Sequence, residues 1–285
     1  MSVAMPEGRA LLNLGCGSTG HPAFVNVDLH PHPGIISHDL RKGVPFPDGT
    51  YDLVYHSTML SHFRRPEAVR FMQECRRVLK PGGILRVVTE DLEQLCRMYL
   101  QKVEAAWNGD RTAGDDHEWL LLEMFDQPMR ERPGGEMLTY LMKPELPNEA
   151  FIRQRVGEQG AVMIAGARSR LRPDGSLAPR PSPGLLARAK SQVKKTILTI
   201  LAGPGGDDAL EVGRFRLFSG SSSYRFYDRY SLRELFRAAG FTDVSLRSPD
   251  VSGFRNWKDV NLDLAPSGQP ARPHTLIMEG VRGQP

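Results

Sequence analysis

Residues 11–28 read LLNLGCGSTGHPAFVNVD. A short apolar run, Ala10–Leu14, leads into the glycine-rich segment Gly15–Gly20, and a second apolar run, Phe24–Asp28, follows directly. Glycines after a strand let the backbone approach a ligand, and open α/β sheets bind ligands at the carboxyl ends of their strands. A dinucleotide fold places a full helix and about 20 residues between such a loop and its ribose-binding acid. Asp28 follows too soon for that arrangement, so the spacing disfavours NAD.

Further apolar runs predict strands at 35–38, 52–56, 84–88, 244–246 and 275–278. Helical spacing between Pro66 and Lys80 predicts a helix that Pro81-Gly82-Gly83 ends. A second helix is predicted from Ser231, with Glu234 completing a capping box. Strands separated by helices or tight turns indicate a parallel sheet with covered faces.

The composition is that of a soluble globular chain, with 40% apolar and 25% charged residues and no apolar run long enough to span a membrane. The N-terminal residues lack a signal-peptide pattern, so we expect a cytoplasmic protein. The three scattered cysteines, at Cys16, Cys75 and Cys96, suit a reducing compartment and offer no disulfide framework. The histidines near residues 30–38 have no further ligands at metal-site spacing, so we expect no metal.

The predicted organisation is one α/β domain, formed by residues 1–90 and 210–285, with a helical and irregular insertion at 91–209. Within the insertion, residues 168–184 are rich in Pro, Gly and Arg, which is typical of a flexible segment. Residues 185–201 predict a basic amphipathic helix. We expect its apolar stripe to pack on its own domain, and contact with anionic lipid is the alternative.

The positive charge is local. Residues 168–195 carry eight Arg or Lys against one Asp, whereas the whole chain has a formal net charge of +4. The rest of the chain is therefore slightly acidic, and we expect no nucleic-acid partner.

Two acids end neighbouring predicted strands. Asp28 ends the second strand and Asp39 the third, so both are expected at the carboxyl edge of the sheet. One carboxylate would accept hydrogen bonds from ribose hydroxyls and the other from an exocyclic adenine amine. The alternative is that both are ordinary turn residues.

Several motifs, in this order and spacing, resemble the class I S-adenosylmethionine-dependent methyltransferases. The matching stretches are Leu12–Gly17, Val27-Asp28, His38-Asp39-Leu40, Pro45–Asp52 and Glu74–Gly83. The resemblance covers about the first 95 residues. It implies a Rossmann-like sheet, mostly parallel with an antiparallel last strand, and a large, mainly helical insertion. It also implies S-adenosylmethionine as cofactor and S-adenosylhomocysteine as product.

More narrowly, the chain resembles bacterial methyltransferases associated with polysaccharide and glycan biosynthesis. This resemblance rests on the brief loop before Val27-Asp28, on Asp126-Gln127 with Gly134–Met137, and on Tyr227–Leu232.

The class I resemblance implies a set of cofactor-binding residues: Asn13, Gly15, Cys16, Gly17, Asp28, Leu29, Asp39, Leu40, His56 and Ser57. The glycines would lie against the amino-acid end of the cofactor, Asp28 at the ribose, Asp39 with Leu40 at the adenine, and His56 with Ser57 near the methionine. Because the chain begins close to its first strand, we expect part of the 90–210 insertion to cover the cofactor.

A hydroxyl acceptor gains from a nearby general base, most often histidine. The candidate catalytic residues are His62, His117 and Asp126, and a surface or structural role is the alternative for each. The sequence Tyr55-His56-Ser57-Thr58 lacks the Asn/Asp-Pro-Pro-aromatic motif of methyltransferases that act on nucleobase amines.

The sequence therefore predicts a methyltransferase acting on a hydroxyl of a sugar, a glycan precursor or a related small molecule. Methylation of another metabolite, such as a natural product or a quinone, and an inactive cofactor-binding scaffold remain as alternatives. The oligomeric state is not indicated.

Overall fold

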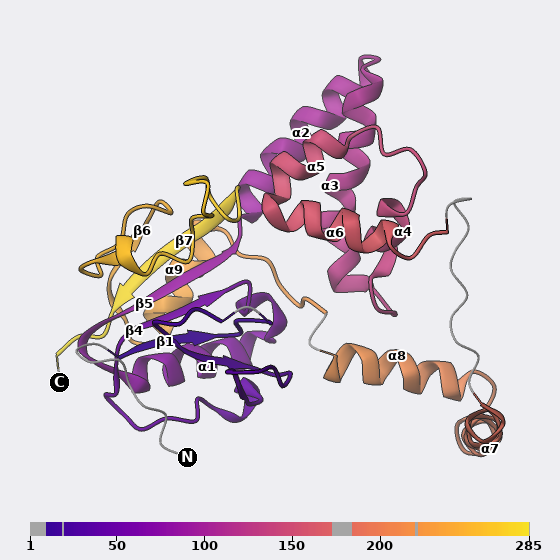
Figure 1. Cartoon of the computed structure of the whole chain (residues 1–285), viewed down its shortest axis with the longest axis horizontal. Coiled ribbons are helices and arrows are strands. Elements are labelled where there is room, and N and C mark those ends of the chain that lie inside the picture. Colours follow the sequence, from indigo (N-terminus) through magenta and orange to yellow (C-terminus); the bar gives the residue numbers. More distant parts are fainter. Residues whose placement is uncertain (1–9, 19, 173–183, 220–221, 285) are drawn as a thin grey trace.

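The computed structural model describes residues 10–18, 20–172, 184–219 and 222–284. A seven-stranded sheet lies on the left in Figure 1, near both ends of the chain. The strand order is β3-β2-β1-β4-β5-β7-β6. The strands are β1 (Leu11–Leu14), β2 (Val25–Asp28), β3 (Ile36–Ser37), β4 (Tyr51–Ser57), β5 (Leu79–Glu90), β6 (Thr242–Leu246) and β7 (Thr275–Val281).

Strand direction confirms the expected Rossmann-like fold. Strands β1 to β5 run parallel, whereas β7 runs antiparallel to both β5 and β6. Leu14 pairs with Val27 on one side and with His56 on the other, so β1, β2 and β4 end side by side. Their carboxyl ends form the edge at which such sheets bind ligands.

One face of the sheet is covered by two helices, α1 (Arg65–Val78) and α9 (Arg229–Ala238). Leu12 and Val54 from the sheet pack with Phe71 of α1 and Phe236 of α9 in the main core. The prediction that this helix, α9, begins at Ser231 is wrong. Its N-cap is Asp228, which accepts a hydrogen bond from the Ser231 N–H, so Ser231 lies one turn inside the helix.

The opposite face is covered by an irregular C-terminal segment, residues 248–272, whose helical part is η3 (Trp257–Asp259). Phe254 and Trp257 of this segment pack on Leu53 and Tyr55 of β4. The sheet therefore has helices on one face and an irregular segment on the other.

The expected helical insertion follows β5 directly (Figure 1). It forms a lobe with its own core, in which Trp119, Tyr140, Ile152 and Ile164 are buried. Its helices are α2 (Leu92–Trp107), α3 (Arg111–Met129), α4 (Gly135–Leu141), α5 (Glu149–Val156) and α6 (Glu158–Arg168).

Two further helices, α7 (Leu185–Ala202) and α8 (Gly206–Phe218), complete the insertion. The predicted helix at 185–201 is confirmed, but the expectation that its apolar stripe packs on its own domain is wrong, because Val193, Ile197, Ile200 and Leu201 are exposed. The predicted domain boundary between 209 and 210 falls inside α8. Most of the predicted flexible segment, residues 173–183, lies outside the described residues.

Within the described part of the chain, none of the helices combines the length and the apolar character needed to cross a membrane.

Candidate functional site

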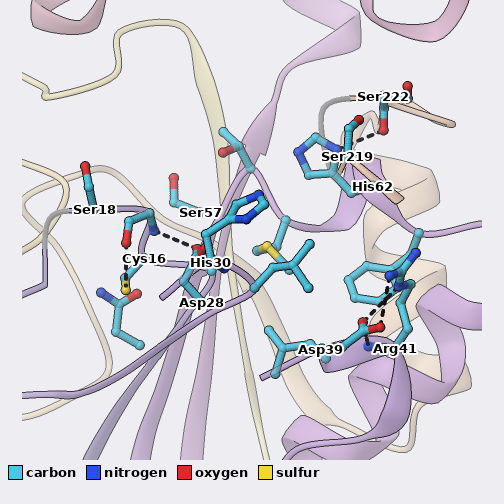
Figure 2. Close-up of a pocket in the computed structure, with 18 of the residues that line it drawn as sticks. Cys16, Ser18, Asp28, His30, Asp39, Arg41, Ser57, His62, Ser219 and Ser222 are labelled. Atoms are coloured by element: carbon cyan, nitrogen blue, oxygen red, sulfur yellow. Dashed lines mark hydrogen bonds and ion pairs between the residues drawn. The ribbon is translucent and has the colours of Figure 1, made fainter. Parts of the chain in front are cut away.

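A cavity of about 900 Å³ opens at the carboxyl edge of β1, β2 and β4. Figure 2 shows Cys16, Asp28, Asp39 and His62 around it. Its walls also include the start of α6, the end of α8 with some of the residues after it, and the C-terminal segment. These wall residues are Glu158, Gln159, Val162, Arg216, Leu217, Ser219, Ser222, Tyr224, Leu262, Ala271 and Arg272. The strands therefore supply the floor of the cavity, and distant segments supply its walls.

The glycine loop after β1 turns sharply into the cavity. The N–H groups of Gly15 and Cys16 both donate to the Val27 carbonyl oxygen, at 2.8 and 3.3 Å. Gly15 has φ +70°, and a Cβ there would lie 2.1 Å from the Met59 sulfur. Gly17 has φ +65°, and a Cβ there would meet no atom within 4 Å. The loop thus needs glycine at both positions for its backbone, and at Gly17 it leaves room for a ligand.

Asp28 closes the loop from the end of β2. Its two carboxylate oxygens accept hydrogen bonds from the N–H groups of Gly17 and His30, at 2.8 and 3.1 Å (Figure 2). Each carboxylate oxygen has a second lone pair, so both can accept another hydrogen bond from a ligand hydroxyl. Burial raises the pKa of the neighbouring Cys16 thiol to about 11, with Asp28 adding to the effect, so this thiol stays protonated at neutral pH.

Asp39 lies at the start of η1 (Leu40–Lys42) and pairs with Arg41. The Arg41 guanidinium donates to both Asp39 oxygens, at 2.8 and 2.9 Å, and these hydrogen bonds lower the pKa of Asp39. The same guanidinium donates to the Leu217 carbonyl oxygen at the end of α8, at 2.6 Å. Arg41 therefore joins the adenine side of the predicted site to the helix that forms another wall.

His62 lies at the cavity in η2 (Leu60–His62), and its Nδ1 is 2.9 Å from the Ser222 carbonyl oxygen. A carbonyl oxygen only accepts hydrogen bonds, so Nδ1 carries the proton in this contact. In the neutral ring, Nε2 then has the lone pair that can take a proton. The geometry selects the tautomer that a general base requires.

Most of the predicted cofactor-binding residues line this cavity. They are Asn13, Gly15, Cys16, Gly17, Asp28, Leu29, Asp39, Leu40 and Ser57.

The predicted contact of His56 with the cofactor is contradicted, because the His56 side chain is fully buried and lies outside the cavity lining. Side chains alternate along a strand, so His56 of β4 points away from the face of Tyr55 and Ser57 and packs against Phe71 of α1. Its two ring nitrogens have no hydrogen-bond partner in the described structure, and burial lowers its pKa to about 3.

The predicted catalytic roles of His117 and Asp126 are also contradicted, since neither residue lines the cavity. The ring of His117 packs against Tyr99, with centroids 5.2 Å apart. Asp126 is buried, pairs with Arg130 and accepts a hydrogen bond from the Glu136 N–H. Both residues therefore have structural contacts inside the helical lobe.

Other cavity residues carried no sequence signal. Met59 packs over Gly15, and Tyr224 donates through its hydroxyl to the Arg216 carbonyl oxygen at 3.0 Å. Arg272 lines the cavity from the C-terminal segment. These residues come from distant stretches without a recognisable motif, so spacing alone could not assemble them.

Residues 23–87 match the model of a family described as "Methyltransferase domain". A search among curated proteins finds no match.

Among solved structures, the chain is similar to the PH0226 protein of Pyrococcus horikoshii OT3, at 25% identity over 31% of this chain and 52% of that one, with a TM-score of 0.27. It is similar to a Haloferax volcanii putative methyltransferase in complex with the Trm112 activator, at 12% identity over 98% and 84% of the two chains, with a TM-score of 0.37.

A third similar structure is a Burkholderia thailandensis 1,6-didemethyltoxoflavin-N1-methyltransferase with bound S-adenosylhomocysteine, at 14% identity over 30% and 46% of the two chains, with a TM-score of 0.27. The chain spans about half of the P. horikoshii protein's length. All three TM-scores are low, so the substrates of these proteins say nothing about the acceptor of this one.

The family match covers β2 and β4 with Asp28 and Asp39, and it begins after β1 and the glycine loop. The strand order with its antiparallel β7 and the glycine loop beside Asp28 agree with that match. Residues 23–87 therefore match a methyltransferase domain, and the cofactor is S-adenosylmethionine.

Proposed function

We propose that the protein transfers the methyl group of S-adenosylmethionine to a hydroxyl of a sugar, a glycan precursor or a related small molecule, with His62 as the general base. The observation that carries the proposal is the hydrogen bond from His62 Nδ1 to the Ser222 carbonyl oxygen, 2.9 Å long, at the cavity. It orients the imidazole and leaves Nε2 as the proton acceptor.

The cavity fits the cofactor at several points. The open space beside Gly17 gives a ligand close access to the backbone, and the Asp28 carboxylate has the lone pairs to accept two ribose hydroxyls. Asp39 and Leu40 would hold the adenine, as the resemblance implies, with Arg41 fixing the position of Asp39. S-adenosylmethionine supplies a methyl group that its sulfonium makes electrophilic.

The chain's own residues then have to orient the acceptor and take up its proton. His62 would accept the hydroxyl proton at Nε2 as the oxygen bonds to the methyl group, the bond from sulfur to methyl breaks and S-adenosylhomocysteine leaves. The Ser222 carbonyl would stabilise the resulting imidazolium through Nδ1–H. The Ser222 hydroxyl is buried at the cavity without a hydrogen-bond partner among the described residues. An unpaired buried hydroxyl is costly, and a polar acceptor would satisfy it.

The association with glycan biosynthesis rests on the narrower sequence resemblance, and a cavity lined by many polar groups suits an acceptor with several hydroxyls. Methylation of a natural product or quinone is the nearest alternative. A scaffold that binds the cofactor without turnover is the alternative from another class.

Calorimetric titration with S-adenosylhomocysteine tests the cofactor site. We expect micromolar binding by the wild type and about a hundredfold weaker binding by Asp28→Ala, because two charge-assisted hydrogen bonds of about 1.5 kcal/mol each are lost. Asp259→Ala, on the exposed helix η3, is the matched control and should bind normally. Equal affinity in wild type and Asp28→Ala would refute the assignment of Asp28.

Transfer of a labelled methyl group to a panel of sugars and glycan precursors tests catalysis. His62→Ala should lower kcat by about 10²- to 10⁴-fold, the usual contribution of a general base, while affinity for S-adenosylhomocysteine is kept. His117→Ala, a histidine away from the cavity, is the control and should retain activity. Turnover by His62→Ala at the wild-type rate would remove the base assignment, and intact cofactor binding without turnover on any acceptor would favour the scaffold.

A further inference from the structure

Helix α7 is amphipathic and carries charge of one sign only. From Leu185 to Ala202 its sequence is LLARAKSQVKKTILTILA, which contains one Arg, three Lys and no acid. The lysines are Lys190, Lys194 and Lys195. At 1.5 Å per residue, a helix of this length is about 27 Å long.

The apolar face of α7 is exposed. The exposed fractions of Val193, Ile197, Ile200 and Leu201 are 60%, 49%, 76% and 78%. Their spacing places them along one side of the helix, since each residue turns the helix by about 100°. Four adjacent large apolar side chains in water form the kind of contiguous patch that marks an interaction surface.

The one extensive contact of α7 within the described residues is with α8, and it uses the other side of the helix. Lys195 pairs with Asp207 of α8 at 3.3 Å. Leu198 is partly buried, unlike the residues on either side of it. Leu198 and Lys195 lie about 140° and 200° around the helix from Val193. The exposed apolar face therefore points away from α8, and α8 lies between α7 and the sheet in Figure 1.

The charges beside this face identify its partner. Lys190 lies about 60° from Val193, within the apolar stripe, and Lys194 lies about 100° from it, at the edge of the stripe. No ion pair is found for either within the described chain, whereas Lys195 has Asp207. A partner that covers the stripe must accept apolar side chains and neutralise these two cations. An anionic membrane surface does both, because its acyl boundary takes the stripe and its headgroups take the lysines.

Other partners fit less well. In a second copy of this chain, the same lysines would face each other around the same stripe, and like charges repel. A nucleic acid would use the lysines but would leave the apolar side chains in water.

We propose that α7 is a membrane-surface helix that lies in the headgroup region of an anionic bilayer, with Val193, Ile197 and Ile200 inserted and Lys190 and Lys194 on phosphates. This proposal does not depend on the identity of the methyl acceptor. Because Arg216 and Leu217 of α8 line the cavity, binding through α7 would hold the site close to the bilayer. An acceptor carried on a lipid would then be within reach.

Co-sedimentation of the full chain with vesicles tests the proposal. We expect binding to vesicles that contain phosphatidylglycerol, little binding to phosphatidylcholine alone, and weaker binding at higher salt. Lys190→Gln/Lys194→Gln should weaken binding to anionic vesicles about thirtyfold, from about 1 kcal/mol for each lysine. Val193→Ser/Ile197→Ser/Ile200→Ser should lower binding to the phosphatidylcholine level.

Matched controls distinguish vesicle binding by α7 from nonspecific binding through other exposed apolar or cationic side chains. Leu100→Ser/Trp107→Ser removes two exposed apolar side chains of α2, and Lys42→Gln/Lys258→Gln removes two exposed lysines elsewhere. Both controls should bind anionic vesicles like the wild type. Affinity for S-adenosylhomocysteine and circular dichroism verify that every variant is folded, and they keep this test separate from that of the methyl acceptor.

Three results would overturn the proposal. One is equal binding of the wild type to neutral and anionic vesicles, or binding to neither. Another is vesicle binding that the triple Ser variant retains. The third is concentration-dependent dimerisation in sedimentation velocity that the triple Ser variant abolishes, without vesicle binding by the wild type, which would assign the stripe to a second copy.

Discussion

At the scale of single residues, His56 has an imidazole whose two nitrogens make no hydrogen bond in the described part of the chain. It is fully buried between β4 and α1, with its ring 5.2 Å from that of Phe71. Burial in apolar surroundings disfavours the charged ring, which lowers the pKa of His56 to about 3. The native state therefore keeps this histidine neutral.

This burial predicts a pH dependence of stability. Between about pH 6.5 and 3 the unfolded chain protonates His56 and the folded chain does not, so the free energy of unfolding falls as the pH is lowered. From pH 7 to pH 5 the loss from His56 is about 2 kcal/mol. Over the same pH range, the free energy of unfolding in urea should fall by about 2 kcal/mol less for His56→Leu than for the wild type. Parallel losses in the two proteins would contradict a buried, neutral His56.

The position of His56 also shows what residue-level reasoning lacked. The motif predicted contact with the methionine moiety, yet Tyr55 and Ser57, on the other face of β4, line the cavity instead. Strict alternation along a strand was the available signal. His62 was predictable as a histidine near the fourth strand, but its tautomer depends on Ser222, 160 residues further along the chain.

At the scale of elements, a loop joins β1 to β2 at the place where a dinucleotide fold has a helix. Residues 15–24 contain turns but no helix among those described, and Asp28 follows within one short strand. The site therefore depends on backbone turns, which glycine enables, more than on a helix N-terminus. Gly15 is the tightest point, because Met59 occupies the space that a side chain would need.

A pair of glycine substitutions tests this loop. Gly15→Ala introduces both a positive φ and a clash with Met59, whereas Gly34→Ala introduces a positive φ of +73° with open space around it. In urea unfolding, Gly34→Ala should lose about 1 kcal/mol from the positive φ, and Gly15→Ala should lose more because of the added clash. Calorimetry with S-adenosylhomocysteine should then show at least a tenfold loss for Gly15→Ala and little change for Gly34→Ala. Equal losses of affinity in the two variants would mean that the clash with Met59 does not affect cofactor binding.

The sequence predicted the elements of the sheet well, because apolar runs between turn residues determine most of them. It predicted less well where tertiary contacts decide. Strand β5 extends back to Leu79, through Pro81-Gly82-Gly83, because β4 pairs with it there. The packing of α7 was also predicted wrongly, since an amphipathic pattern shows that a helix has an apolar face and does not show what covers it.

At the scale of the whole molecule, a buried charge cluster fastens the C-terminal segment to the sheet. Arg86 of β5 is fully buried and pairs with Asp263 and Glu279, at 2.7 Å each. Its guanidinium also donates to the carbonyl oxygens of Ser248 and Val251, at 2.9 Å. Tyr55 donates to the other Asp263 oxygen at 2.7 Å. The cluster thus positions the segment that carries Leu262 and Arg272 to the cavity.

Removal of Arg86, the cation at the centre of this cluster, should strongly destabilise the fold. Arg86→Met leaves the buried Asp263 without a cation and Glu279 with Arg247 alone, and we expect it to cost about 3–5 kcal/mol in urea unfolding. Arg97→Ala is the control. It breaks an ion pair with Glu93 in which the Arg97 side chain is 72% exposed, and pairs of this kind are worth about 0–1 kcal/mol. A cost below 1 kcal/mol for Arg86→Met would show that the cluster does not hold the segment.

The fold as a whole was predictable, and the cavity only in part. The floor is formed by consecutive motifs within the first 60 residues, each with a known place at the strand ends. The walls come from α6, α8 and the C-terminal segment, which spacing could not bring together. Two of the three predicted catalytic residues, His117 and Asp126, were wrong because the helical lobe uses them for its own packing.

The pairing of β5 with β7 has a consequence for how the chain is synthesised. β5 ends at Glu90 and β7 begins at Thr275, so the ribosome makes the whole helical insertion between the two partners. Until β7 emerges, one edge of β5 has no strand to pair with, and Arg86 lacks Glu279. Open strand edges attract other chains, and long-range pairing of this kind is slow. The nascent protein is therefore most prone to aggregate after its cofactor-binding strands have formed and before its last strand is made.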